Sequence, residues 1–211
     1  GDAVDIAVDK QRHLNLARNH TATHLLQAAL RKVLGNHVNQ AGSLVTPDHL
    51  RFDFTHFSPV TQAELDKIEA LVNEEILKNV PVTIEEMALD AAKEKGAMAL
   101  FGEKYGDVVR VVSVDDFSCE LCGGSHVANT SVIGSFRITS ETGTGSGVRR
   151  IEAVTGPAAL KLAKDESQEL QQLAGLLKAK VGDAPAKLEA LLAQLKDTEK
   201  ELAQLKKDAA L

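Results

Sequence analysis

The stretch Cys119-Glu-Leu-Cys122-Gly-Gly-Ser-His126 decides how the rest of the chain is interpreted. A cysteine and a histidine separated by Gly-Gly-Ser can hold one ion from a tight turn, because glycines let the backbone curl closely around it. Far upstream, the chain contains the second half of such a site in His20-Thr-Ala-Thr-His24. Two histidines four positions apart on a helix project from one face and can bind the same ion.

His20, His24, Cys122 and His126 together would provide three imidazoles and one thiolate. This donor set suits zinc better than magnesium or calcium. Cys119 is a competing ligand, since Cys119, Cys122, His126 and one upstream histidine form an alternative set. We prefer both histidines of the helix, because one helical turn presents both to the same ion.

The chemistry of this predicted zinc site has two interpretations. Four protein ligands ordinarily close a structural zinc site, whereas a hydrolytic zinc keeps one position open. Thr21 follows the first histidine, so there is no His-Glu-x-x-His and the general base of a metalloprotease is missing. A hydrolytic site would need water as an extra ligand, or a zinc that positions substrate while other groups handle the proton.

Length and composition limit the class of protein. The chain has 211 residues, enough for one or two domains with a buried core, and a formal charge of −6. That charge argues against non-specific binding of nucleic acid, but not against a site for one RNA end.

Two cysteines beside a histidine indicate ligands in a reducing compartment. With no visible signal peptide and no membrane span, we expect a cytoplasmic protein. The missing initiator methionine suggests a piece of a longer protein.

Apolar periodicity predicts alternating helices and strands. Asn19 is expected to cap a helix that places His20 and His24 in its first two turns and ends at Gly35. Further helices are predicted over 61–79 and 88–95, and strands over 37–46, 50–55, 82–87, 108–114, 133–140 and 147–154. The cysteines are expected in the loop after 108–114. This order indicates an α+β domain with a mostly antiparallel sheet.

Composition changes at Gly156-Pro157. Beyond this point leucines recur at three-to-four spacing among Ala, Lys, Glu, Asp and Gln, and the stretch 181–185 interrupts the pattern. We therefore expect an antiparallel helical hairpin. The predicted domains are 1–156 and 157–211.

Weaker candidates for ligand binding lie on the predicted strands. Gln40, Gly42 and Ser43 offer an amide, a bare backbone and a hydroxyl for a polar ligand, although an ordinary half-exposed strand would show the same residues. Arg149 follows the glycine-rich turn 143–147, which could hold a phosphate or a carboxylate. That turn could equally be a flexible hairpin, since its spacing fits neither a Walker loop nor a Rossmann fingerprint.

Several longer blocks resemble the editing domain of alanyl-tRNA synthetase. They occur in order between about residue 10 and residue 156: Asn19–Leu26, Gln40–Val45, Arg51–Phe54, Gly96–Tyr105, Glu120–Val127 and Gly147–Gly156. The 157–211 segment resembles the start of the C-terminal region of that enzyme. The threonyl-tRNA synthetase editing domain has similar metal-type spacing, and the block from Gly147 favours the alanyl family.

The resemblance implies a zinc-containing esterase that removes serine or glycine from the 3′-terminal ribose of mischarged tRNA(Ala). On this basis His20, His24, Cys122 and His126 match the zinc ligands. Gln40 matches an editing-pocket residue, and Thr23 is a second catalytic candidate. Ser125 replaces the usual threonine, and Cys119 stands where the family commonly has a non-ligand residue. The implied partners are the tRNA(Ala) 3′ end, the rest of the synthetase and, through the C-terminal helices, a second copy.

Elementary physics is consistent with such an activity. A pocket sized for alanine cannot reject the smaller glycine and discriminates poorly against the added hydroxyl of serine, so a second hydrolytic site is needed. An aminoacyl ester is already activated, so water placement and carbonyl polarisation can suffice without the missing glutamate. No motif for ATP binding or amino-acid activation is visible. The alternatives are a free-standing trans-editing protein and a non-enzymatic tRNA-binding or oligomerisation module with structural zinc.

Overall fold

The computed structural model describes residues 3–99, 105–145 and 147–209. It divides into two compact units, the first ending at Leu160 and the second beginning at Lys161. Within the motifs discussed above, residues 100–104 of the block at 96–105 and residue 146 of the glycine-rich turn lie outside the described residues.

Helix α1 (Lys10–Leu34) is the central element of the first unit. The prediction that Asn19 caps it is wrong, because Asp9 is the N-cap and its carboxylate accepts a hydrogen bond from the backbone N–H of Arg12 at 3.0 Å. Asn19 is instead buried in the helix, where its amide donates to the carbonyl of Thr46 and its oxygen accepts from the hydroxyl of Thr155. The helix ends at Gly35, as predicted.

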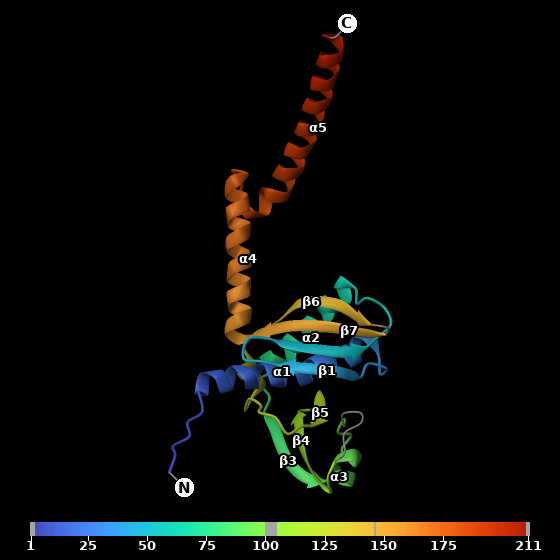
Figure 1. The fold of residues 1–211 in the computed structure, drawn as a ribbon, viewed down its shortest axis with the longest axis vertical. Coiled ribbons are helices and arrows are strands. Elements are labelled where there is room, and N and C mark those ends of the chain that lie inside the picture. Colours follow the sequence, from blue (N-terminus) through green and yellow to red (C-terminus); the bar gives the residue numbers. More distant parts are fainter. Residues whose placement is uncertain (1–2, 100–104, 146, 210–211) are drawn as a thin grey trace. The chain divides into compact units, whose positions relative to one another are not determined.

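A four-stranded antiparallel sheet covers one side of α1. Its order is β1-β2-β7-β6, formed by β1 (Gln40–Val45), β2 (Leu50–Thr55), β6 (Phe136–Gly145) and β7 (Val148–Thr155). Phe52 pairs with Ile151, and both side chains are fully buried beneath α1 and α2 (Gln62–Leu77). Figure 1 shows both helices on one face of this sheet. The core of the unit therefore lies between the sheet and these two helices.

A second, three-stranded sheet lies on the other side of α1 (Figure 1). It consists of β3 (Val82–Ala88), β4 (Val108–Val114) and β5 (Ser118–Leu121), with α3 (Leu89–Glu94) after β3. The α+β class and antiparallel pairing are confirmed, but the strands form two sheets rather than one. Strand β5 lies where a loop was expected, because Cys119 pairs with Ser113 of β4. A short 3₁₀ helix, η1 (Thr130–Ile133), precedes β6.

The C-terminal part of the chain is helical, with α4 (Gly156–Leu176), the short η2 (Val181–Asp183) and α5 (Ala184–Asp208). The interruption near 181–185 is confirmed. The antiparallel packing predicted for these helices is not seen, because the leucines that would meet between them are exposed: Leu170, Leu173, Leu188, Leu191, Leu195, Leu202 and Leu205. None of the described helices combines the length and the apolar composition that a membrane span requires.

Candidate metal centre

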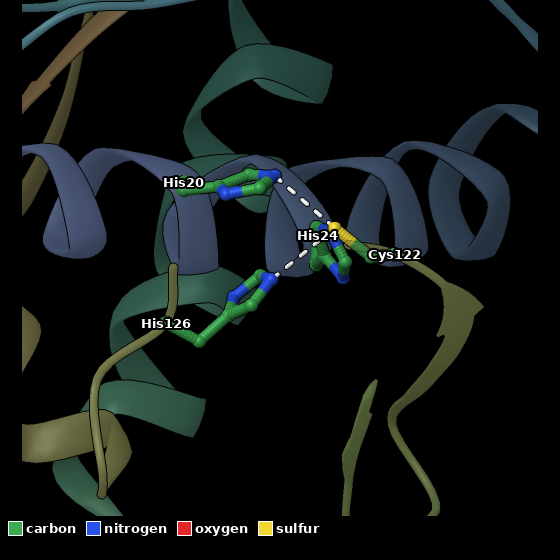
Figure 2. Close-up of side chains that lie close together, drawn as sticks. All are labelled: His20, His24, Cys122 and His126. Atoms are coloured by element: carbon green, nitrogen blue, oxygen red, sulfur yellow. Dashed lines mark hydrogen bonds between the residues drawn. The ribbon is translucent and has the colours of Figure 1, made fainter. Parts of the chain in front are cut away.

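Four metal-binding side chains converge between α1 and the loop after β5 (Figure 2). His20 and His24 project from consecutive turns of α1, and their ligand atoms lie within 4.8 Å of those of Cys122 and His126. The Nε2 atoms of His20 and His126 are each 3.4 Å from the Sγ atom of Cys122. The ring of His20 stacks on that of His126, with centroids 4.3 Å apart. The structure thus brings the four predicted ligands together.

The loop carrying Cys122 and His126 approaches α1 very closely. A Cβ atom on Gly124 would lie 2.0 Å from Cε1 of His20, whereas one on Gly123 would meet open space. A side chain at position 124 would therefore force the His20 ring or the loop to move, because the ring occupies the place of a Cβ atom. The sequence analysis attributed the glycines of this turn to backbone flexibility, but Gly124 does not adopt a positive φ, so the close approach of His20 is the reason for glycine here.

Arg110 of β4 holds this loop from the other side. Its guanidinium donates hydrogen bonds to the carbonyl oxygens of Cys122 and Gly124, each at 2.7 Å. The sequence analysis missed this residue. A single arginine within the β-branched stretch 108–114 was the available signal, because a charge in a buried strand needs a specific partner.

Two ring nitrogens that face away from the thiol have their own partners. Nδ1 of His20 donates to the carbonyl of Ser125 at 3.2 Å, and Nδ1 of His126 lies 3.0 Å from the hydroxyl oxygen of Thr21. These contacts direct Nε2 of both rings toward Cys122. Thr21, at the position where a metalloprotease would carry its glutamate, thus orients a ligand instead.

Burial keeps these imidazoles neutral. It lowers the pKa of His20, His24 and His126, and the pKa of His24 falls to about 3. Neighbouring imidazoles lower the pKa of His24 and His126 further, and Arg110 lowers that of His20 and His126, while the hydrogen bond to Ser125 partly opposes the shift at His20. Neutral imidazole is the form that binds metals. Nδ1 of His24 is also buried without a hydrogen-bond partner among the described residues. The donor set and the neutral rings both fit zinc.

Cys119 does not join this cluster. Strand alternation directs it away from the centre, where its sulfur accepts a hydrogen bond from the hydroxyl of Ser113 at 3.4 Å. Among the described residues, the group of ligand atoms contains Cys122 and not Cys119. The competing ligand set is therefore not formed.

A cavity of about 480 Å³ has side chains of α1 in its wall. It is lined by Gln27, Arg31, Asn39, Gln40, Thr55, Met98 and Ala99. Gln27 and Arg31 follow His24 by three and seven positions, so they share its helix face. At the rise of an α-helix they lie about 5 and 10 Å further along the axis. Gln40 therefore shares a cavity with two side chains of the helix that carries His20 and His24, although none of the four candidate ligands is among the described residues that line it.

The remaining sequence candidates are elsewhere. Thr23 is buried, and its hydroxyl donates to the carbonyl of Asn19 at 2.8 Å. Gly42 lies against Asp53, and Ser43 is exposed on β1. The guanidinium of Arg149 binds both carboxylate oxygens of Glu141, at 2.5 and 2.6 Å. These four residues are not among the described residues that line the cavity with Gln40, so their roles stay predictions.

Comparison with protein families gives a match over residues 109–152 to the "Threonyl and Alanyl tRNA synthetase second additional domain". This region contains Arg110, Cys122 and His126, but not the two histidines of α1.

Curated proteins named alanine–tRNA ligase match almost the whole chain. The protein from Listeria welshimeri is 57% identical over 95% of this chain, that from Acetivibrio thermocellus 55% over 98%, and that from Desulfitobacterium hafniense 59% over 91%. The chain spans only about a quarter of these relatives, covering 23%, 23% and 22% of their lengths.

Proposed function

Because this chain corresponds to a segment of the alanine–tRNA ligases, we propose that it is the editing domain of such an enzyme. It hydrolyses the ester bond of mischarged Ser-tRNA(Ala) and Gly-tRNA(Ala), and its partners are the tRNA 3′ end and the remainder of the ligase. The observation that carries this proposal is the convergence of three histidines and one cysteine at α1, whose following turns line the cavity that contains Gln40.

His20, His24, Cys122 and His126 are the residues that would hold zinc. When bound, zinc supplies Lewis-acid chemistry suited to an acyl ester. The amide of Gln40 can donate to the ester carbonyl or hold the attacking water. Arg31 carries a positive charge in the wall of the same cavity, which suits a phosphate of the terminal nucleotide.

Selectivity for serine follows from the polarity of the cavity wall. Gln27, Asn39 and Gln40 provide amide donors and acceptors that a serine hydroxyl can use and an alanine methyl cannot. A site that hydrogen-bonds a substrate hydroxyl discriminates strongly against an analogue that lacks it. This contact accounts for serine alone, because glycine, like alanine, lacks the hydroxyl; hydrolysis of glycine is proposed from the resemblance to the editing domain.

The test is the hydrolysis of Ser-tRNA(Ala), Gly-tRNA(Ala) and Ala-tRNA(Ala) with the zinc-loaded chain in excess over tRNA. We expect loss of serine and glycine while alanine is retained. Cys122→Ala should remove both zinc and activity, whereas Gln40→Ala should keep zinc and hydrolyse more slowly. Wild-type rates in Cys122→Ala would refute hydrolysis at this centre.

The competing function is a non-enzymatic module with structural zinc. A folded, zinc-loaded chain that leaves all three esters intact under these conditions would favour it. A free-standing editing protein would share the proposed chemistry; the similarity to much longer ligases favours a ligase segment.

A second proposal concerns assembly, and the exposed leucines of α4 and α5 favour it. Leu188, Leu191, Leu195, Leu202 and Leu205 follow heptad spacing on α5 and are each more than 40% exposed. We propose that this stripe pairs with a second copy of the chain.

A further inference from the structure

His24 differs from the other two imidazoles of the cluster in its outer contact. Nδ1 of His20 and of His126 contact Ser125 and Thr21, whereas Nδ1 of His24 is buried with no hydrogen-bond partner among the described residues. A histidine that binds zinc almost always donates its second ring N–H to a carboxylate, carbonyl or water. One hydrogen-bond acceptor is therefore missing from the centre, and it would have to lie within hydrogen-bond distance of Nδ1 of His24.

Glu120 is the acidic side chain beside this nitrogen. Its Oε2 atom lies 3.7 Å from Nδ1 of His24, and the two side chains are only 9% and 6% exposed. The other carboxyl oxygen, Oε1, accepts a hydrogen bond from the hydroxyl of Ser118 at 3.1 Å. Because the terminal torsion of a glutamate is soft, Oε2 can close the remaining gap to hydrogen-bond distance.

The strand that carries Glu120 is held firmly. Backbone hydrogen bonds join the N–H of Met98 to the carbonyl of Cys119, and the N–H of Leu121 to the carbonyl of Met98. Strand alternation then directs Glu120 and Cys119 to opposite faces, with Glu120 toward α1. The position of this carboxyl group is therefore set by the sheet and not by His24.

A buried acid without a basic partner is costly to keep. Among the described residues, His24 is the one basic side chain within 4 Å of the Glu120 carboxyl group, and its ring is neutral. Zinc bound by one thiolate and neutral imidazoles keeps one net positive charge, which a neighbouring carboxylate balances. The metal centre thus supplies the missing partner for a residue that otherwise has no reason to be acidic.

We propose that Glu120 is a positioning residue of the metal centre: its Oε2 accepts the Nδ1–H of His24 and so directs Nε2 of that ring at the ion. The inference rests on the proposed function only in requiring that zinc binds the cluster. Glu120 would act on the metal only through His24, and it would contact neither the metal nor the substrate.

The test is the affinity of the chain for Zn²⁺, measured by competition with a chromophoric chelator. Glu120→Leu removes the acceptor at similar volume and should weaken binding about 10- to 100-fold. Glu120→Gln keeps an acceptor oxygen and should lose less. Glu75→Gln is the matched control, because Glu75 is also buried but pairs with Lys78, the residue after α2, at 2.6 Å. It should bind zinc like the wild type.

Two further readouts separate positioning from packing. The visible absorption spectrum of the Co²⁺-loaded protein should change in Glu120→Leu and not in Glu75→Gln, because it reports ligand geometry. Thermal unfolding of the metal-free protein should differ less between wild type and Glu120→Leu than unfolding of the zinc-loaded protein.

Wild-type zinc affinity and an unchanged cobalt spectrum in both Glu120 variants would overturn the inference. So would an equal loss of stability with and without zinc, which indicates packing alone. If the wild-type chain itself binds no zinc, the proposed metal centre fails first and the role of Glu120 fails with it.

Discussion

Gly124 is the residue at which the metal cluster should tolerate least change. In Gly124→Ala the new methyl group would sit 2.0 Å from the His20 ring, so the ring or the loop must move. We expect zinc affinity to fall by about 100-fold or more, as for the loss of a ligand orientation. Elemental analysis of zinc per chain after dialysis measures it.

Gly123→Ala is the matched control, because its Cβ atom would meet nothing within 4 Å. It should retain zinc like the wild type. Equal zinc content in the two alanine variants would contradict the close approach of loop and helix.

The buried imidazoles predict how acid affects the metal-free protein. In the unfolded chain their pKa is 6.5, and in the folded chain it is lower. The unfolded state therefore binds more protons below pH 6.5, so the free energy of unfolding falls as the pH falls, by about 1.4 kcal/mol per pH unit and net proton.

Glu120 acts in the opposite direction. Burial raises its pKa from 4.5 to about 8, so its contribution to stability is lost as the pH rises toward 8. Three histidines outweigh one glutamate on the acid side, and we expect maximal stability near neutral pH. Urea unfolding of chelator-treated protein between pH 5 and 8 measures this. His24→Gln should make the free energy of unfolding fall less steeply as the pH is lowered. The exposed residue His37 gives the control His37→Gln, and an equal pH dependence of the two variants would contradict the role of the buried His24.

At the scale of secondary-structure elements, β4 determines the position of the ligand loop through Arg110. Arg110→Ala removes both hydrogen bonds to the loop carbonyls, so we expect zinc affinity to fall about 10- to 100-fold. Chelator competition measures it, with Arg51→Ala on the other sheet as control. A rise in affinity would show that repulsion between Arg110 and the cation outweighs its effect on the loop.

Helix α2 begins with a capping box. The hydroxyl of Thr61 accepts from the backbone N–H of Glu64 at 3.3 Å, and the carboxylate of Glu64 accepts from the backbone N–H of Thr61 at 2.8 Å. Thr61→Ala should lower the free energy of unfolding by about 1 kcal/mol. Denaturant titration measures this, and the exposed neighbour Ser58 gives the control Ser58→Ala. Equal stability of the two variants would mean that the cap contributes nothing.

At the scale of the whole molecule, the exposed leucines of α5 predict self-association. Serine at Leu188, Leu195 and Leu202 would remove three apolar contacts from one heptad stripe. We expect sedimentation equilibrium to show a dimer for the wild type and a monomer for the triple variant, with equal zinc content. A wild-type chain that stays monomeric at high concentration would refute this assembly.

The sequence by itself determined the ligand chemistry and most of the local structure. Two histidines on one helix face and a Cys-Gly-Gly-Ser-His turn each indicate half of a metal centre, because the spacing within each half is local; that the halves meet is a contact between distant segments. The strands 50–55 and 108–114 match their observed bounds, since apolar and β-branched patterns depend on near neighbours. The similarity to alanine–tRNA ligases was likewise contained in the sequence.

Only the tertiary structure decided which residues support the centre. Asn19 is not a helix cap but a buried residue whose side chain hydrogen-bonds to Thr46 and Thr155. Residues 118–121 form strand β5 because they pair with the edge of β4. The roles of Arg110, Thr21 and Glu120 depend on contacts between segments far apart in the chain. Such contacts arise when strands pair and helices pack, and the local periodicity of the sequence does not indicate them. The types of the metal-binding residues were therefore predictable, whereas the residues that hold them in position were not.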